Sequence, residues 1–187
     1  TLQSDKSNFV YYPYDCPHRE KNGWTADAAL SAEQMLYSFD AKQSLEQWLL
    51  QIRNAQTPNG VLPGIIPTAG WGFEWGNGPA WDSVLVELPF ELYRFYGDEK
   101  TVHDSAEAIN KYFAYIATRL NDDGLVNVGL GDWVQTYTKW EGDFETPVEI
   151  TDSLTMLDLA AKTITMFGAV GLPVENIVDF AEKLTLS

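Results

Sequence analysis

The sequence has few residues from which a disulfide or a metal site could be built. Cys16 is the only cysteine, which excludes an intrachain disulfide. The two histidines, His18 and His103, are too few to complete a zinc-ligand pattern with it. The first glycine after Asp15 comes too late for a calcium-binding loop. We therefore expect neither a metal ion nor any other cofactor.

Basic residues are also scarce. The 187 residues carry 27 acidic and 12 basic side chains, a net charge of −15, and no Lys/Arg cluster that would bind nucleic acid or an anionic membrane. No apolar run reaches the length of a membrane span, about 18 residues, and no signal-peptide pattern follows Thr1. We expect a neutral ligand and neither a nucleic-acid nor a membrane partner. The cytoplasm is slightly favoured, and the alternative that a leader lies on a longer parent chain stays open.

Apolar residues make up 45% of the chain and recur at helical spacing over much of it. The periodicity predicts helices over residues 25–39, 40–56, 79–96, 98–120, 147–167 and 174–184. Pro89 lies inside the third of these and should kink it, because it has no N–H to donate. The buried stripe of the fifth helix is expected to run through Ile150, Leu154, Leu157, Ala161, Ile164 and Phe167.

Several helix starts carry capping signals. Thr25 and Asp98 are expected N-caps, and Asp40 with Gln43 has the spacing of a capping box. Thr146 is followed by a proline at the first helical position and a glutamate at the third, which is also typical of a helix start.

Three long segments lack helical periodicity. They are an aromatic-rich lead-in over residues 1–23 and loops over 57–79 and 121–146, the last with a short hairpin expected around 125–128. The turns near residues 40, 97 and 168–172 are short by comparison. If consecutive helices are antiparallel, all three long segments emerge at one end of the bundle. The prediction is one all-α domain of antiparallel helical hairpins, with its functional face at that end.

The segment from Tyr14 to Asp27 concentrates groups that are typical of a binding site. Glycine and proline keep it irregular, and it carries three carboxyl groups, a guanidinium and an indole: Asp15, Glu20, Asp27, Arg19 and Trp24. An indole face together with carboxylates that accept hydrogen bonds from hydroxyls suits a sugar ring. Glu20 can act as an acid or as a carboxylate, depending on which neighbour dominates its pKa.

Each of these residues also has an ordinary structural explanation. Glu20 could be an exposed acid paired with a neighbouring base, and Asp15 could cap a turn. Asp27 and Asp82 stand in first turns, where an acid favours the helix dipole. The tryptophans could be core residues. The long loops bring further acids and tryptophans to the same end: Trp71, Glu74, Trp75, Asp132, Trp133 and Trp140.

The first of these segments resembles a family signature. Its pattern is Asp15-Cys16-Pro17-x-Arg19-Glu20-x-x-Gly23-Trp24-Thr25-x-Asp27, which is similar to that of the bacterial α-L-rhamnosidases of the six-hairpin type, glycoside hydrolase family 78. Two further segments resemble the second and third active-site segments of that family: Pro79-Ala80-Trp81-Asp82 and Gly131-Asp132-Trp133.

The resemblance implies about half of an α/α toroid and an inverting hydrolysis of terminal α-L-rhamnosides. By residue-wise transfer, Glu20 is expected to be the general acid. The residues expected to bind the rhamnose are Asp15, Arg19, Trp24, Asp27, Trp81, Asp82, Asp132 and Trp133. The expected partner is a rhamnose-containing oligosaccharide or glycoside.

Inversion also needs a general base, about 6.5–9.5 Å from the acid. In the family this glutamate lies in the second half of the toroid, downstream of Ser187. Glu74, Glu141 and Glu145 lie in loops expected on the correct face, and no pattern makes any of them the base. We therefore expect the isolated chain to give no turnover, and to self-associate through helix flanks that half a toroid leaves uncovered.

Two other functions stay open. One is a non-catalytic carbohydrate-binding or partner-docking helical module that uses the same tryptophans. The other is a six-hairpin glycosidase that acts on another sugar, because a shared scaffold does not settle specificity.

Overall fold

The computed structural model describes residues 2–68, 70, 72–74, 78–133 and 145–187, and the regular structure in these ranges is helical. The only strand-like pairs there are isolated bridges, one of them between Leu120 and Val126 beside the expected hairpin. The predicted all-α class is confirmed. The helices are α1 (Leu2–Asn8), α2 (Thr25–Ser38), α3 (Lys42–Ala55), α4 (Pro79–Asp82), α5 (Val84–Tyr96), α6 (Glu99–Ala117), α7 (Val148–Ala169) and α8 (Glu175–Thr185).

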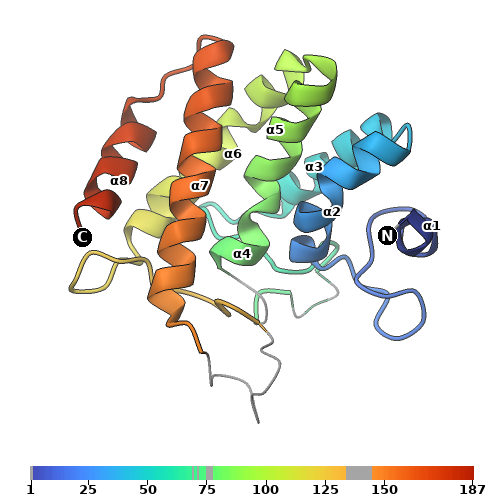
Figure 1. The fold of residues 1–187 in the computed structure, drawn as a ribbon, viewed down its shortest axis with the longest axis horizontal. Helices are drawn as coiled ribbons and strands as arrows, with labels where there is room; N and C mark the ends of the chain where they lie inside the picture. Colours follow the sequence, from blue (N-terminus) through green and yellow to red (C-terminus); the bar gives the residue numbers. More distant parts are fainter. Residues whose placement is uncertain (1, 69, 71, 75–77, 134–144) are drawn as a thin grey trace.

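Short turns join the longer helices into three hairpins, α2 with α3, α5 with α6, and α7 with α8, and the helices of the last two hairpins pack on each other. Helix α5 lies between α2 and α7, while α6 contacts α3 on one side and α8 on the other (Figure 1). The hairpins therefore stand side by side, with α2, α5 and α7 in one row and α3, α6 and α8 in the other. The predicted helical hairpins are confirmed.

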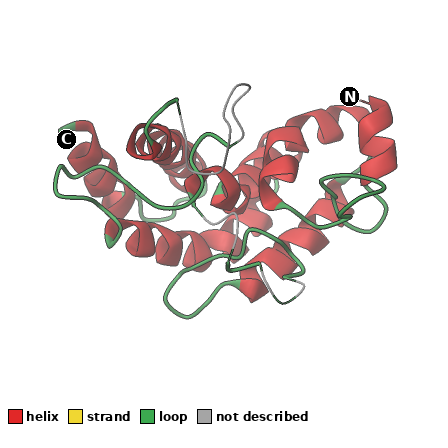
Figure 2. Cartoon of the chain, turned by 90° about the horizontal axis from the view of Figure 1, so that it is seen from below, coloured by secondary structure: helices red, strands yellow, loops and turns green. Residues whose placement is uncertain are grey.

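The long connections lie together at the lower end of Figure 1, and Figure 2 looks onto that end. The second long segment packs against the first at the start of α2. There the Thr25 N–H donates to Gly64 O over 3.0 Å, and the Ile66 N–H donates to Gly23 O over 2.9 Å. Only glycine fits at position 23, since a Cβ there would lie 2.0 Å from Ile66 O. This close approach joins two of the long segments into one loop layer.

The core lies between the two rows of helices and follows the predicted stripe of α3. Leu45, Trp48, Leu49 and Ile52 are all at most 1% exposed, at the i, i+3, i+4, i+7 spacing of one helix face. The indole of Trp48 also donates its Nε1–H to Ile66 O over 3.1 Å. Burial of each of these side chains stabilises the hairpins by about 1.5–3 kcal/mol.

Helix α1 was not predicted, because its residues show no apolar period. Its one buried residue is Asp5, whose carboxylate accepts a hydrogen bond from the Gln34 side chain of α2. The helix is thus held by a polar contact with a segment distant in sequence, which periodicity cannot report. The expectation of an irregular lead-in over residues 1–23 is wrong for this part.

One predicted N-cap is confirmed and three are wrong. The Asp98 carboxylate accepts the Thr101 N–H over 3.1 Å at the start of α6. Thr25 lies inside α2, and its hydroxyl donates to Gly64 O rather than capping the helix. Helix α3 begins after Ala41 and α7 begins after Pro147, and neither start has a hydrogen bond from a capping side chain. The predicted capping box and Thr146 therefore do not cap these helices. Contacts from the loop layer replace the local cap at Thr25.

Two features of the helix interiors also differ from the prediction. The segment 79–96 is divided at Ser83 into α4 and α5, and Pro89 lies within the continuing α5. Helix α7 buries a different face from the one expected, since Leu154 is 62% exposed. The buried face of α7 carries Asp152, Ser153, Met156, Leu159, Ala160, Thr163, Met166 and Phe167. Because this face carries polar residues, a search for an apolar stripe does not identify it as the buried face.

None of the helices in the described ranges is long and apolar enough to cross a membrane. The same ranges bring together no group of three or more side chains that could hold a metal ion.

Candidate active site

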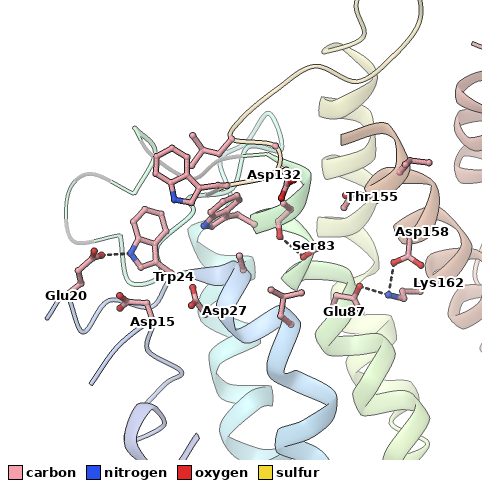
Figure 3. A pocket seen from close by; sticks show the side chains of 18 residues that line it. Asp15, Glu20, Trp24, Asp27, Ser83, Glu87, Asp132, Thr155, Asp158 and Lys162 are labelled. Carbon is pink, nitrogen blue, oxygen red and sulfur yellow. Dashed lines mark hydrogen bonds and ion pairs between the residues drawn. The ribbon is translucent and has the colours of Figure 1, made fainter. Parts of the chain in front are cut away.

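A pocket of about 1010 Å³ opens where the loop layer meets the row formed by α2, α5 and α7. Its wall combines the lead-in, the first turns of α2 and α5, the loop before residue 134 and the middle of α7 (Figure 3). Most of the residues expected to form a site lie on this wall: Asp15, Glu20, Trp24, Asp27, Trp81, Asp132 and Trp133. Segments as far apart in sequence as those of Asp15 and Lys162 thus contribute to one cavity.

Glu20 is held in a loop that is closed at its base by Asp15. The Asp15 N–H donates to Asn22 O over 3.0 Å, and the Asn22 N–H donates to Asp15 Oδ1 over 2.9 Å. Inside the loop, the Glu20 N–H donates to Cys16 Sγ over 3.1 Å. Lys21 closes the turn with a φ of 56°, in the left-handed region. Asp15 therefore fixes the position of Glu20 and still borders the pocket.

The Glu20 carboxylate is oriented by an indole. Trp24 Nε1–H donates to Glu20 Oε2 over 2.7 Å, and Figure 3 shows the two side chains together with Asp15 and Asp27 on one side of the pocket. Glu20 itself is exposed at the rim. The contact fixes one carboxylate oxygen and leaves the other available to a ligand.

On this side of the pocket, the Asp27 carboxyl group lies near the charges of Asp15 and Glu20. Partial desolvation by the pocket wall raises the pKa of Asp27, and the charges of Asp15 and Glu20 raise it further. Asp27 remains open to solvent. Like charges this close disfavour ionisation of the Asp27 carboxyl group.

The aromatic part of the wall consists of Trp24, Trp81 and Trp133. Trp81 is 8% exposed and belongs to the core as well, while Trp24 and Trp133 are half-buried. The core and the binding interpretations of these tryptophans are therefore compatible. Indole faces beside carboxylates give the pocket both apolar surface and hydrogen-bond acceptors.

Arg19 and Asp82 are not on the pocket wall. Arg19 is exposed outside it. Asp82 is 2% exposed, and its Oδ2 accepts the Gly78 N–H over 3.2 Å at the start of α4. Burial raises the pKa of Asp82 well above its ordinary value. The Tyr112 hydroxyl is near enough to act on this pKa, although the geometry falls short of a hydrogen bond. Asp82 thus supports the wall from beneath.

A second buried carboxyl group, Asp152, was missed by the sequence analysis. It is 1% exposed, and its Oδ2 accepts the Val128 N–H over 2.9 Å. Burial raises the pKa of Asp152 to about 7, against the hydrogen bond from Val128, and the nearby Glu149 adds to the rise. Asp152 anchors the loop that leads to Asp132 and Trp133. The one sequence signal for its burial was its position four residues before Met156, which places the two side chains on the same helix face.

The opposite side of the pocket carries a charged cluster that was also missed. Lys162 Nζ of α7 lies 2.6 Å from Glu87 Oε1 of α5 and 2.7 Å from Asp158 Oδ2 of α7. Burial by itself would lower the pKa of Lys162, but the carboxylates of Asp158 and Glu87 raise it. Nothing local in the sequence links Glu87 to Lys162.

Several candidates from the loops add nothing to this wall. Trp71, Trp75, Trp140 and Glu141 lie outside the described residues. Glu74 and Glu145 are exposed and do not border the pocket.

The chain is similar in sequence to a family of glycosidases. Residues 1–182 match the model of the bacterial alpha-L-rhamnosidase 6 hairpin glycosidase domain. An alpha-L-rhamnosidase of Streptomyces avermitilis is 30% identical over 182 residues, which cover 95% of this chain and 17% of that protein. An alpha-L-rhamnosidase of an Alteromonas species is 32% identical over 138 residues, which cover 73% of this chain and 15% of that protein. The chain thus spans less than a fifth of the length of these relatives.

Solved structures show the same likeness. The Streptomyces avermitilis alpha-L-rhamnosidase complexed with L-rhamnose superposes with a TM-score of 0.83 at 26% identity, covering 98% of this chain and 18% of that one. The alpha-L-rhamnosidase from Dictyoglumus thermophilum gives a TM-score of 0.85 at 28% identity, covering 96% and 20%. The hairpins described above therefore correspond to part of the six-hairpin domain of such proteins.

Proposed function

The chain belongs to the bacterial alpha-L-rhamnosidase six-hairpin glycosidase family, and from this premise we propose that its pocket supplies the acid side of an inverting hydrolysis of terminal α-L-rhamnosides. The observation that carries the proposal is the convergence of Glu20, three further carboxyl groups of the expected site and three tryptophans on one cavity. Because the chain matches only a small share of each relative, the activity itself is part of the proposal.

In this proposal Glu20 is the general acid. Its carboxyl proton passes to the glycosidic oxygen as the bond from that oxygen to C1 of the rhamnose breaks. The hydrogen bond from Trp24 Nε1 to Glu20 Oε2 holds the group in one orientation, so the other oxygen can face the leaving group. Positioning of this kind is needed for effective proton transfer, because the donor must lie within hydrogen-bond reach of the reacting atom.

The remaining wall holds the sugar. Trp24, Trp81 and Trp133 offer apolar faces to the ring carbons, and Asp27 and Asp132 offer acceptors to its hydroxyls. Asp15 acts mainly through the Glu20 loop, which it closes. Arg19 and Asp82 stay outside the set of direct contacts, since neither borders the pocket.

Inversion further requires a carboxylate that takes a proton from the attacking water. Among the described residues, the other pocket carboxylates Glu87 and Asp158 are paired with Lys162, and we assign the base to a part of the domain outside these 187 residues. The chain on its own is therefore expected to bind the sugar without turning it over.

The experiment compares this chain with a longer parent chain that carries the rest of the domain. On an aryl α-L-rhamnoside, the short chain gives no product. The longer protein is active and loses about 10²- to 10⁴-fold in kcat on Glu20→Gln, the size typical of a general acid. Glu74→Gln is the matched control, because Glu74 is an exposed loop acid outside the pocket.

Two results would overturn parts of this assignment. Turnover by the short chain alone means that a base lies inside it. Full activity of the longer Glu20→Gln protein means that another group is the acid. A panel of aryl glycosides tests the sugar, since stronger hydrolysis of a different glycoside removes rhamnose as the substrate.

A sugar-binding role without catalysis is the second candidate, because the three tryptophans on the pocket wall suit a sugar ring whether or not an acid acts on it. It predicts that the longer protein binds L-rhamnose and releases no product from any aryl glycoside.

A further inference from the structure

The cluster of Glu87, Lys162 and Asp158 lies in the same pocket as Glu20 and is not needed for the proton transfer proposed above. Figure 3 shows it across the pocket from Glu20, Asp15 and Trp24. The Glu87 and Lys162 side chains are 15% and 25% exposed, and Asp158 is 57% exposed. The cluster is thus partly sheltered, with its outer member at the surface.

Stability alone explains this cluster poorly. Partial burial of three charges carries a desolvation penalty that offsets much of their mutual attraction. Asp158 and Lys162 form an i,i+4 pair, a kind that contributes little to stability. A hydrophobic contact between α5 and α7 at this place would join the helices at least as well. The charged groups therefore point to a role at the pocket surface.

The hydrogen-bonding capacity of the cluster is only partly used. A lysine ammonium has three N–H donors, and two of them face Glu87 Oε1 and Asp158 Oδ2. This leaves one donor on Lys162, whose Nζ also lies 5.9 Å from the centroid of the Phe90 ring, and the second oxygen of each carboxylate outside these hydrogen bonds. One donor flanked by two acceptors in fixed positions matches a pair of neighbouring hydroxyl groups, because each hydroxyl both donates and accepts.

Depth in the pocket decides which part of the substrate can reach the cluster. Glu20 is exposed at the rim, so the glycosidic oxygen and its leaving group must lie near the rim as well. Glu87 and Lys162 are the more sheltered groups and lie opposite. A sugar that reaches from Glu20 across the pocket would present to Lys162 the side away from the glycosidic bond, which carries hydroxyls.

We propose that Glu87, Lys162 and Asp158 form a hydroxyl-recognition site that selects the terminal sugar by two neighbouring hydroxyl groups on the side away from the glycosidic bond. This inference rests on the proposed function, since it takes the occupant of the pocket to be a terminal sugar. It makes these three residues determinants of specificity and assigns none of them to the chemical step.

The test combines protein variants with ligand variants. Binding of L-rhamnose and of its 2-, 3- and 4-deoxy analogues to the 187-residue chain is measured by calorimetry and by tryptophan fluorescence, for the wild type and Lys162→Met. We expect at least one deoxy analogue to bind the wild type about tenfold to a hundredfold more weakly than L-rhamnose, the range for a hydrogen bond to a charged group. In Lys162→Met, the ratio of the dissociation constant of that analogue to the dissociation constant of L-rhamnose should fall to nearly one.

Controls separate recognition from folding. Asp158→Asn, a milder change at a more exposed position, should reduce the same difference in part. Lys100→Met removes another i,i+4 lysine–aspartate pair on α6, away from the pocket, and should change nothing in binding. Thermal unfolding shows whether each variant is folded; if Lys162→Met is not, Asp158→Asn decides.

The outcomes are distinct. If the penalties for the deoxy analogues are the same in the wild type and the folded variants, the recognition site is refuted although the proposed function stands. If the wild type binds none of these sugars, the proposed function fails, and this inference fails with it.

Discussion

The buried Asp152 makes the stability of this protein depend on pH in an unusual direction. Burial raises its pKa from 3.8 to about 7 in the folded chain, while in the unfolded chain the carboxyl group is in water and titrates near 4. Between these values the folded state holds a proton that the unfolded state has released. Stability is therefore greatest below about pH 4 as far as this group is concerned, falls as the pH rises to about 7, and is flat above it.

The size of the effect follows from the shift. A rise from 3.8 to about 7, at 1.36 kcal/mol per pKa unit, corresponds to at most about 4 kcal/mol of unfolding free energy. This is a large share of the roughly 5–15 kcal/mol that stabilises a typical domain. Asn at position 152 can still accept the Val128 N–H and has no charge to bury, so Asp152→Asn should lose this pH dependence while keeping the loop in place.

The assay is urea unfolding followed by far-ultraviolet circular dichroism at several pH values between 4 and 8. The wild type and Asp152→Asn share all other titrating groups, so the difference between their unfolding free energies isolates Asp152. We expect this difference to shift by up to about 4 kcal/mol in favour of Asp152→Asn as the pH rises from 4 to 7. Asp123→Asn changes an exposed turn residue, and its unfolding free energy should change with pH in the same way as that of the wild type. Parallel curves for Asp152→Asn as well would refute the reasoning.

Two further predictions concern the backbone around the pocket. Gly78→Ala should destabilise the protein by about 2 kcal/mol or more and weaken sugar binding, because Gly78 has a φ of 121° and a Cβ there would lie 2.5 Å from Val128 O; urea unfolding with a sugar titration measures both, and unchanged values would contradict the packing. Asp98→Ala should cost about 1 kcal/mol through loss of the N-cap of α6 and leave sugar binding unchanged, which the same two measurements check; a binding defect would be the unexpected result.

Local patterns were sufficient wherever a helix is specified by its own residues. The stripe of α3 follows its apolar spacing, because Leu45, Trp48, Leu49 and Ile52 are all buried. Gly97 ends α5 with a φ of 62°, and Asp98 caps the helix that follows. Loop lengths alone predicted that the long segments meet at one end, and the pocket contains residues from the first and the third of them. Antiparallel helices with short turns leave no other arrangement for those segments.

Other features were decided by contacts between distant segments. Helix α1 is held by the Asp5–Gln34 hydrogen bond, and Thr25 donates to a carbonyl 39 residues away instead of capping its helix. The buried face of α7 carries Asp152 and Thr163, since their hydrogen bonds make polar residues acceptable inside. An apolar period cannot report such a face.

The pocket likewise has features that the sequence determines and features that only the tertiary structure determines. The sequence by itself identified the Tyr14–Asp27 segment as a candidate site, because a carboxyl group beside an indole is recognisable within one short stretch. Only the tertiary structure decided that Asp82 lies beneath the wall rather than on it, and that Lys162 meets Glu87 across 75 residues. The physical reason is that burial and ion pairing depend on which helix faces meet, and this is set by the packing of α5 between α2 and α7.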